Sequence, residues 1–280
     1  MRQQAPECSS HRMRIASRIL LARPSLCRRA VHPFASHGSH MVVAAWGDPV
    51  SFVGAVVTRS SRAAEGLTSL HLAVPASVLA GYTVPGQFLQ VRVAEGDKPS
   101  FMAIASPVGA DPQAGVELLV RETPSTAALC GLGAGAALQV SPVQGRGFAV
   151  GALHPPSSFP NVLLFATGSG VSPVAALLDT PGALRAAERG GVHLFLGVRS
   201  PAHLPWGDRL DAWRASGVRI TTVFSSVEGR YVQDAFLAAG GVGDAATTGA
   251  VLVGQKAMAE TLTATLLAAG VPMERILTNY

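Results

Sequence analysis

The sequence predicts an antiparallel β-barrel followed by an α/β domain with a doubly wound parallel sheet. Three observations predict this fold class. The chain has 280 residues, 48 % of them apolar, which is enough for two packed cores. Residues 50–145 consist of short extended segments between glycine and proline turns. From Asn161 onward, apolar strands alternate with helical segments, which is the order that builds a parallel sheet.

The barrel half is predicted from apolar and polar residues that alternate along its segments, because successive side chains of a strand point to opposite faces. The clearest example is the run from Gln87 to Val93. The strands expected on this basis are Ser51–Arg59, Leu67–Val74, Gln87–Val93, Phe101–Ser106, Gly115–Arg121 and Ala137–Val140. We also expect a short helix at Ser125–Leu132, and a first domain that spans residues 41–155.

The second half is expected to span residues 156–280, because a linker with three prolines lies at Gly151–Pro160. The predicted strands are Val162–Ala166, Val192–Val198, Val218–Phe224, Ala250–Val253 and Arg275–Thr278. The predicted helices are Val171–Leu178, Trp206–Ala215, Val232–Ala239 and Ala257–Ala269.

A glycine turn between the first strand and first helix of this half predicts a dinucleotide site. Gly168 permits a tight turn, and Gly170 lets the backbone approach a phosphate without a Cβ in the way. Pro173 suits the first helical turn, whose free N–H groups attract an anion. The predicted pyrophosphate residues are Thr167, Gly168, Ser169, Gly170, Ser172 and Pro173. The alternative is an ordinary strand–helix connection of an α/β domain.

This turn departs from the dehydrogenase fingerprint in two ways. Pro173 stands where that fingerprint has its third glycine, and the next strand ends at Val198 without an acid to bind ribose hydroxyls. Arg199 follows that strand instead, and an arginine suits a 2′-phosphate. NADP is therefore favoured, with NAD as the alternative.

Together these motifs resemble the ferredoxin–NADP reductase superfamily across most of residues 48–280, and most closely a plant plastid branch, the fruit-protein type of FAD/NAD(P)-binding oxidoreductase. The nucleotide turn is similar to the family's G-x-G-x-x-P, and residues 98–107 are similar to the branch's flavin segment. The resemblance implies a flavin-binding, ferredoxin reductase-like barrel and a nicotinamide-binding α/β domain, with FAD and NADP as cofactors.

The flavin strand departs from the family's R-x-Y-S pattern, in which arginine holds the flavin pyrophosphate, tyrosine packs on the ring and serine bonds its N5 edge. Ser100, Met102 and Ala103 occupy those places. The resemblance implies flavin contacts from Phe101, Met102, and the backbone amides of Ala103 and Ile104. The alternative is a barrel strand that binds no flavin.

The resemblance implies further site residues beyond this strand. Arg121, Ser125 and Thr126 would hold the flavin pyrophosphate, unless Arg121 is an ordinary surface residue. Ser225 or Ser226 would bind the 2′-phosphate of NADP together with Arg230, and Tyr231 would stack on adenine; the alternative for Arg230 is a solvated loop residue. Val253 stands where the family has a cysteine beside the nicotinamide, and the glycine that follows it in the family is present as Gly254. Tyr280 would stack on the flavin; the alternative is an inert terminus. Ala103, Val253 and Tyr280 are thus the residues expected at the reacting rings.

Residues 1–40 hold seven arginines and one acid, so they carry the positive charge of a chain whose formal net charge is +5. Their composition is typical of a disordered organellar transit peptide, which predicts the chloroplast, with the mitochondrion as the alternative. A basic arm that binds nucleic acid or a membrane is the competing interpretation. The rest of the chain predicts no nucleic-acid site, metal centre, disulfide or membrane span.

The leading hypothesis is an oxidoreductase that passes a hydride from NAD(P)H to FAD and then electrons to an external acceptor. The alternative is a binding module of low or no activity with a regulatory or assembly role, because four family residues around the rings are replaced, at Ser100, Met102, Ala103 and Val253.

Overall fold

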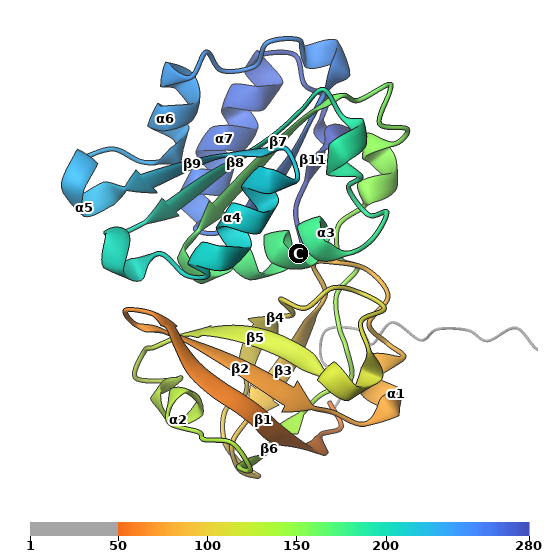
Figure 1. Cartoon of the computed structure of the whole chain (residues 1–280), viewed down its shortest axis with the longest axis vertical. Coiled ribbons are helices and arrows are strands. Elements are labelled where there is room, and N and C mark those ends of the chain that lie inside the picture. Colours follow the sequence, from red (N-terminus) through yellow and green to blue (C-terminus); the bar gives the residue numbers. More distant parts are fainter. Residues whose placement is uncertain (1–49, 280) are drawn as a thin grey trace, which may run out of the picture. The chain divides into compact units, whose positions relative to one another are not determined.

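The computed structural model describes residues 50–279, which contain two β-sheets (Figure 1). The first sheet is antiparallel, with the strand order β4-β3-β6-β1-β2-β5. Its strands are β1 (Val53–Ala64), β2 (Leu67–Ala73), β3 (Phe88–Arg92), β4 (Ser100–Ala103), β5 (Val116–Arg121) and β6 (Ala137–Val140). Two short helices, α1 (Ala76–Leu79) and α2 (Ala127–Cys130), lie in its connections.

This sheet curls into a barrel because its two edge strands meet at one point. Ile104, just beyond β4, bridges Leu118 of β5, and the Ala105 N–H donates to the Glu117 carbonyl at 2.8 Å. Along the rest of their length, β4 and β5 are not neighbours in the hydrogen-bonded order. The barrel therefore keeps a gap between these two strands. Its interior is filled by alternate apolar side chains of the strands, among them Leu70, Leu72, Leu89, Leu118 and Val140.

The second sheet is parallel, with the order β11-β10-β7-β8-β9. Its strands are β7 (Asn161–Thr167), β8 (Gly191–Val198), β9 (Val218–Phe224), β10 (Thr248–Val253) and β11 (Ile276–Leu277). The helices that follow them are α3 (Val171–Asp179), α4 (Gly207–Ala215), α5 (Ser225–Glu228), α6 (Val232–Ala238) and α7 (Lys256–Ala268).

Helices cover both faces of this sheet. On β7, Leu164 packs in the same core as α3 and α4, whereas Phe165 packs with α6 and α7. Neighbouring residues of a strand face opposite sides, so the two helix pairs lie on opposite faces. The chain runs outward from β7 to β9 and then returns to β10 on the other side of β7. The reversal makes the ends of β7 and β10 the topological switch point, where ligands of such sheets bind.

The predicted fold class is confirmed, and the order of strands along the chain is as expected. Strands β6 and β9 have the predicted bounds, whereas β4 ends at Ala103 instead of Ser106, because Ile104 and Ala105 turn toward β5. The helix expected at Ser125–Leu132 is shortened to α2, and α1 and α5 were not predicted. Residues 1–40 and Tyr280 lie outside the described residues. Between residues 50 and 279, no helix combines the length and the hydropathy that a bilayer crossing requires.

The two sheets are joined by shared packing. Leu67 and Leu119 of the barrel belong to the same apolar core as α3 and α4. The barrel therefore packs against the face of the parallel sheet that α3 and α4 cover. Burial of apolar side chains between the two halves contributes to the free energy of unfolding.

Candidate functional site

The glycine turn that follows β7 lies at the switch point of the parallel sheet. It is a short 3-10 turn over Gly168–Gly170, after which α3 begins at Val171. Gly168 has φ of +53°, which an L side chain adopts only at a cost. Thr167 accepts a hydrogen bond from the Gln255 N–H at 3.2 Å, so the turn is tied to the chain that follows β10.

Gly170 is needed for a reason that the sequence did not reveal. A Cβ there would lie 3.0 Å from the Val253 carbonyl oxygen and 3.2 Å from Gly254 Cα. A Cβ on Gly254 would in turn lie 2.1 Å from the Thr167 hydroxyl oxygen. The two glycines thus let the ends of β7 and β10 approach closely. The structure therefore adds a packing role to the phosphate role predicted for Gly170.

Within the first turn of α3, Ser172 offers a polar group without a partner. Its side chain is 2 % exposed, and its hydroxyl makes no hydrogen bond to any described residue. Buried polar groups normally have a partner, so this hydroxyl fits a site that contacts a bound anion. Pro173 is also buried, and it packs without using a backbone N–H that the helix start leaves free. Ser169 is partly exposed within the turn.

The residues predicted for the adenosine end gather beyond β8 and β9, at the same edge of the sheet. The Ser226 hydroxyl donates to the Arg199 carbonyl at 2.6 Å, whereas Ser225 makes no side-chain hydrogen bond among the described residues. Ser225, at the start of α5, is therefore the serine whose hydroxyl is free for a ligand. The Arg199 side chain is exposed, and the Tyr231 ring is 61 % exposed, as a stacking surface requires.

Arg230 is held by a neighbouring acid that was not anticipated. Its Nε donates to Glu228 at 2.7 Å, and the other Glu228 oxygen accepts the Phe224 N–H at 2.8 Å. The Phe224 N–H, followed by Arg230, lowers the pKa of the Glu228 carboxyl. An anionic carboxylate thus stands within the predicted 2′-phosphate site.

In the barrel, the pairing of β3 with β4 decides which way the flavin strand points. Met102 lies opposite Leu89, and Ser100 opposite Val91, whose side chains fill the interior. Met102 packs against that core. Phe101 faces the other way, 59 % exposed, with its ring 5.7 Å from that of Phe88. The side chains of Phe101 and Met102 therefore do not share one face.

The two backbone amides proposed for the flavin ring also differ. The Ile104 N–H donates to the Gln87 carbonyl at 3.1 Å, and the Ile104 side chain is fully buried. Ile104 therefore offers neither its amide nor its side chain, which corrects that expectation. Amides alternate in direction along an edge strand, so the Ala103 N–H points away from β3.

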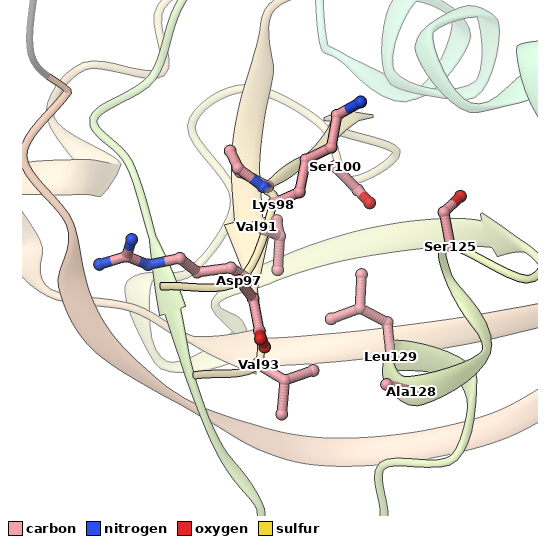
Figure 2. A pocket seen from close by; sticks show the side chains of 10 residues that line it. Val91, Val93, Asp97, Lys98, Ser100, Ser125, Ala128 and Leu129 are labelled. Carbon is pink, nitrogen blue, oxygen red and sulfur yellow. The ribbon is translucent and has the colours of Figure 1, made fainter. Parts of the chain in front are cut away.

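A cavity of about 380 Å³ lies between the start of β4 and α2 (Figure 2). Ser100 and Ser125 line it, and their hydroxyls point to the same side of the cavity in this view. Thr126 is buried, and its hydroxyl donates to the Arg121 carbonyl at 2.5 Å instead. The Arg121 side chain is exposed and does not line the cavity. The structure thus brings Ser125 and Ser100 to one cavity, whereas Thr126 and Arg121 do not line it.

The nucleotide turn and the barrel meet. The turn Gly168–Gly170 lies against β5, the strand that Ile104 bridges. Near the C-terminus, the Asn279 side chain lies 3.4 Å from the carbonyl oxygen of Gly86, two residues before β3. Tyr280, expected at the reacting rings, lies outside the described residues. Two candidate binding regions thus adjoin within one compact unit.

Comparison with known proteins identifies this architecture. No family model matches the sequence. The structure is similar to a ferredoxin NADP⁺ reductase of Neisseria gonorrhoeae with bound FAD and NADP, with a TM-score of 0.66 and 19 % identity, covering 81 % of this chain and 98 % of that one. The chain has the ferredoxin–NADP reductase fold. The family resemblance expected from the sequence is confirmed.

Other proteins of the ferredoxin–NADP reductase fold match as well. The Amycolatopsis cytochrome P450 reductase GcoB has a TM-score of 0.66 at 22 % identity, over 82 % of this chain and 70 % of that one. The CS-b5R domains of human Ncb5or, in an NAD⁺ form, have a TM-score of 0.65 at 16 % identity, over 84 % and 71 %. Both NADP and NAD thus occur in solved structures of this fold.

The chain is also 33 % identical to fruit protein pKIWI502 of Actinidia deliciosa over 210 residues. The match covers 70 % of this chain and 66 % of the fruit protein, just under two thirds of its length. This relative is a plant fruit protein, the type that the sequence resembles.

Two residues of the site escaped the sequence analysis although each has a local signal. Glu228 precedes Arg230 by two positions, which is close enough for an ion pair across the turn. Lys98 lies within the flavin segment and lines the cavity beside Ser100. Arg209 of α4 had no such signal, because its partners Glu117 and Ala105 lie in the other half of the chain.

Proposed function

We propose that this protein is an NADPH-dependent flavin reductase, which binds FAD in the barrel and the dinucleotide at the switch point of the parallel sheet. When bound, NADPH supplies a hydride that FAD accepts, and the electrons then leave to an external acceptor. One observation carries this proposal: the turn Gly168–Gly170 lies against β5 of the barrel, so the two proposed nucleotide sites would adjoin, as hydride transfer requires.

The residues of the α/β half support the dinucleotide part. The backbone of Thr167–Gly170 and the unpartnered Ser172 hydroxyl fit a pyrophosphate at the start of α3. At the adenosine end, Ser225, Arg199 and Arg230 fit a 2′-phosphate, with Tyr231 free to stack on the base. Val253 and Gly254, at the end of β10, would flank the nicotinamide.

The residues of the barrel support the flavin part. The Ala103 amide points away from β3, so it would be free to donate a hydrogen bond to the flavin ring. Ser100 and Ser125 line a cavity of about 380 Å³ that suits the cofactor's phosphates. The half-buried Asn279 lies beside Gly86 of the barrel, so Tyr280 would reach the flavin ring from there. These residues would position the flavin and donate hydrogen bonds to its phosphates, and none needs to act as an acid or a base.

NADPH is favoured over NADH by the two arginines, and Glu228 opposes that preference. A carboxylate that is already bonded to Arg230 repels a 2′-phosphate and can accept a hydrogen bond from a ribose hydroxyl instead. The proposal is that the two arginines outweigh one acid. Steady-state rates with each cofactor test it, and a higher kcat/KM for NADH would overturn the choice of NADPH.

An absorbance spectrum of the purified full chain tests the function as a whole. We expect a yellow protein whose flavin absorption bleaches when NADPH is added without oxygen. A colourless protein that cannot be loaded with FAD would instead support the binding module without turnover. Protein that binds FAD but is not reduced by either nicotinamide would also refute the reductase.

The chloroplast is the proposed location. The arginine-rich composition of residues 1–40 and the similarity to a plant fruit protein support it. Incubation of the full chain with isolated chloroplasts and with mitochondria, followed by protease treatment, tests this location. Protection from protease in mitochondria alone would refute it.

A further inference from the structure

We propose that Lys98 supplies the positive charge that binds the FAD pyrophosphate, in place of the arginine that this chain lacks at Ser100. The inference rests on the proposed function, because it concerns the flavin site of that function. It assigns the charge to a residue of the β3–β4 connection, two positions before the family's arginine position.

The geometry of the cavity points to Lys98. The cavity lies between β4 and α2, and Lys98, Ser100 and Ser125 all line it. Figure 2 shows the Lys98 amine on the same side of the cavity as the two serine hydroxyls. The Ser125 hydroxyl shares a hydrogen bond with the Thr123 hydroxyl at 3.0 Å, whereas the Ser100 hydroxyl and the Lys98 ammonium have no partner among residues 50–279. An ammonium and hydroxyls of this kind are donors that suit a pyrophosphate.

The other charges at the cavity are already engaged. Arg92 donates to the Gln139 side chain at 2.7 Å, and its guanidinium lies 4.1 Å from the centre of the Phe52 ring. The Asp97 carboxylate accepts the Ala94 N–H at 2.9 Å, which ties it to its own loop, and Figure 2 shows it on the side away from the Lys98 amine.

Lys98 is available to a ligand. Its side chain is exposed, and no ion pair joins it to any residue within 50–279. Because the Lys98 ammonium has no ion pair to break, its binding to a phosphate does not require the loss of an existing interaction. Arg121, which was expected to provide this charge, does not line the cavity.

The chain contains a matched control, because Lys98 and Lys256 are its only lysines. Lys256 begins α7, and its ammonium lies 3.7 Å from the Glu260 carboxylate, which makes it a solvent-exposed ion pair. The two lysines can therefore be compared in one molecule under one set of conditions.

The test measures binding of FAD and of riboflavin, which lacks the pyrophosphate, by flavin fluorescence with the full chain. For Lys98→Ala we expect FAD to bind about tenfold more weakly, which corresponds to about 1.4 kcal/mol, whereas riboflavin binding stays within about twofold. The dependence of FAD binding on salt should weaken as well. Lys98→Arg should restore most of the affinity, and Lys256→Ala should change nothing.

Lysine acylation followed by mass spectrometry gives a second measurement that needs no variant. FAD should protect Lys98 but not Lys256, and riboflavin should protect neither. If the wild type binds FAD but Lys98→Ala binds it equally well, the assignment of Lys98 is wrong and the flavin reductase stands. If the wild type binds no FAD at all, both are overturned.

Discussion

Replacement of Arg209 by methionine should lower the stability of the protein by removing hydrogen bonds between the barrel and the parallel-sheet half. Arg209 lies on α4 and makes three contacts: its Nε to Asp179 at 2.6 Å, its Nη1 to Glu117 at 3.0 Å, and its Nη2 to the Ala105 carbonyl at 2.8 Å. Two of these reach the barrel, and Ala105 lies two residues after the end of β4. Methionine keeps most of the aliphatic stem but removes the charge.

The expected magnitude follows from burial and from the partners that remain. The side chains of Arg209 and Glu117 are only 18 % and 12 % exposed, so the loss is that of a largely buried pair, about 3–5 kcal/mol. We expect the lower end of this range, because both carboxylates retain a hydrogen bond in the variant. Asp179 still accepts one from the Trp213 ring N–H at 2.6 Å, and Glu117 accepts one from the Ser69 hydroxyl at 2.7 Å. About 3 kcal/mol corresponds to a fall in Tm of roughly 6–12 °C for a domain of this size.

Calorimetry and rapid kinetics check this prediction. The control is Arg214→Met on the same helix, because the Arg214 side chain is 44 % exposed and pairs only with Asp211 at 2.7 Å. That change should cost under about 0.5 kcal/mol. In Arg209→Met, flavin reduction by NADPH should also slow by at least about tenfold, since misplaced partners react slowly. Equal Tm values for the two variants would refute the reasoning.

Three further predictions concern single residues. Gly254→Ala should lower both Tm and nicotinamide affinity, because its Cβ would lie 2.1 Å from the Thr167 hydroxyl oxygen; Gly243→Ala, in open space, is the control. Glu228→Gln should lower the KM for NADPH several-fold but not that for NADH, because Arg230 is then freed for the phosphate; unchanged KM values contradict this. Burial, followed by the charge of Arg219, lowers the pKa of His193 to about 4. The unfolded form therefore binds a proton at a higher pH than the folded form does. The free energy of unfolding should fall by about 1 kcal/mol as the pH drops from about 6.5 to 4. A Tm difference between wild type and His193→Gln that does not change with pH would contradict this.

Several features of the fold were decided by local sequence. The bounds of β6 and β9 could be predicted because alternating or continuous apolar runs end at turn residues on both sides. The turn at Gly168–Gly170 was equally visible, since a positive φ and an immediate helix start are local properties. The family resemblance rested on the same short motifs.

Other features depended on contacts that no local pattern reveals. Arg209 and Glu117 are 92 residues apart, and Gly170 is packed by Val253 from a strand much later in the chain. The direction of Phe101 follows from the register of β3 against β4, because a shift of one residue turns a side chain to the other face.

The sequence by itself determined that an antiparallel sheet precedes a parallel one, and that a glycine turn joins β7 to α3. Only the tertiary structure decided that this turn lies against β5, that Glu228 holds Arg230, and that Lys98 shares a cavity with Ser100 and Ser125. The physical reason is that helices, strands and tight turns are set by neighbours along the chain, whereas a binding site is set by strand register and by closure of the barrel.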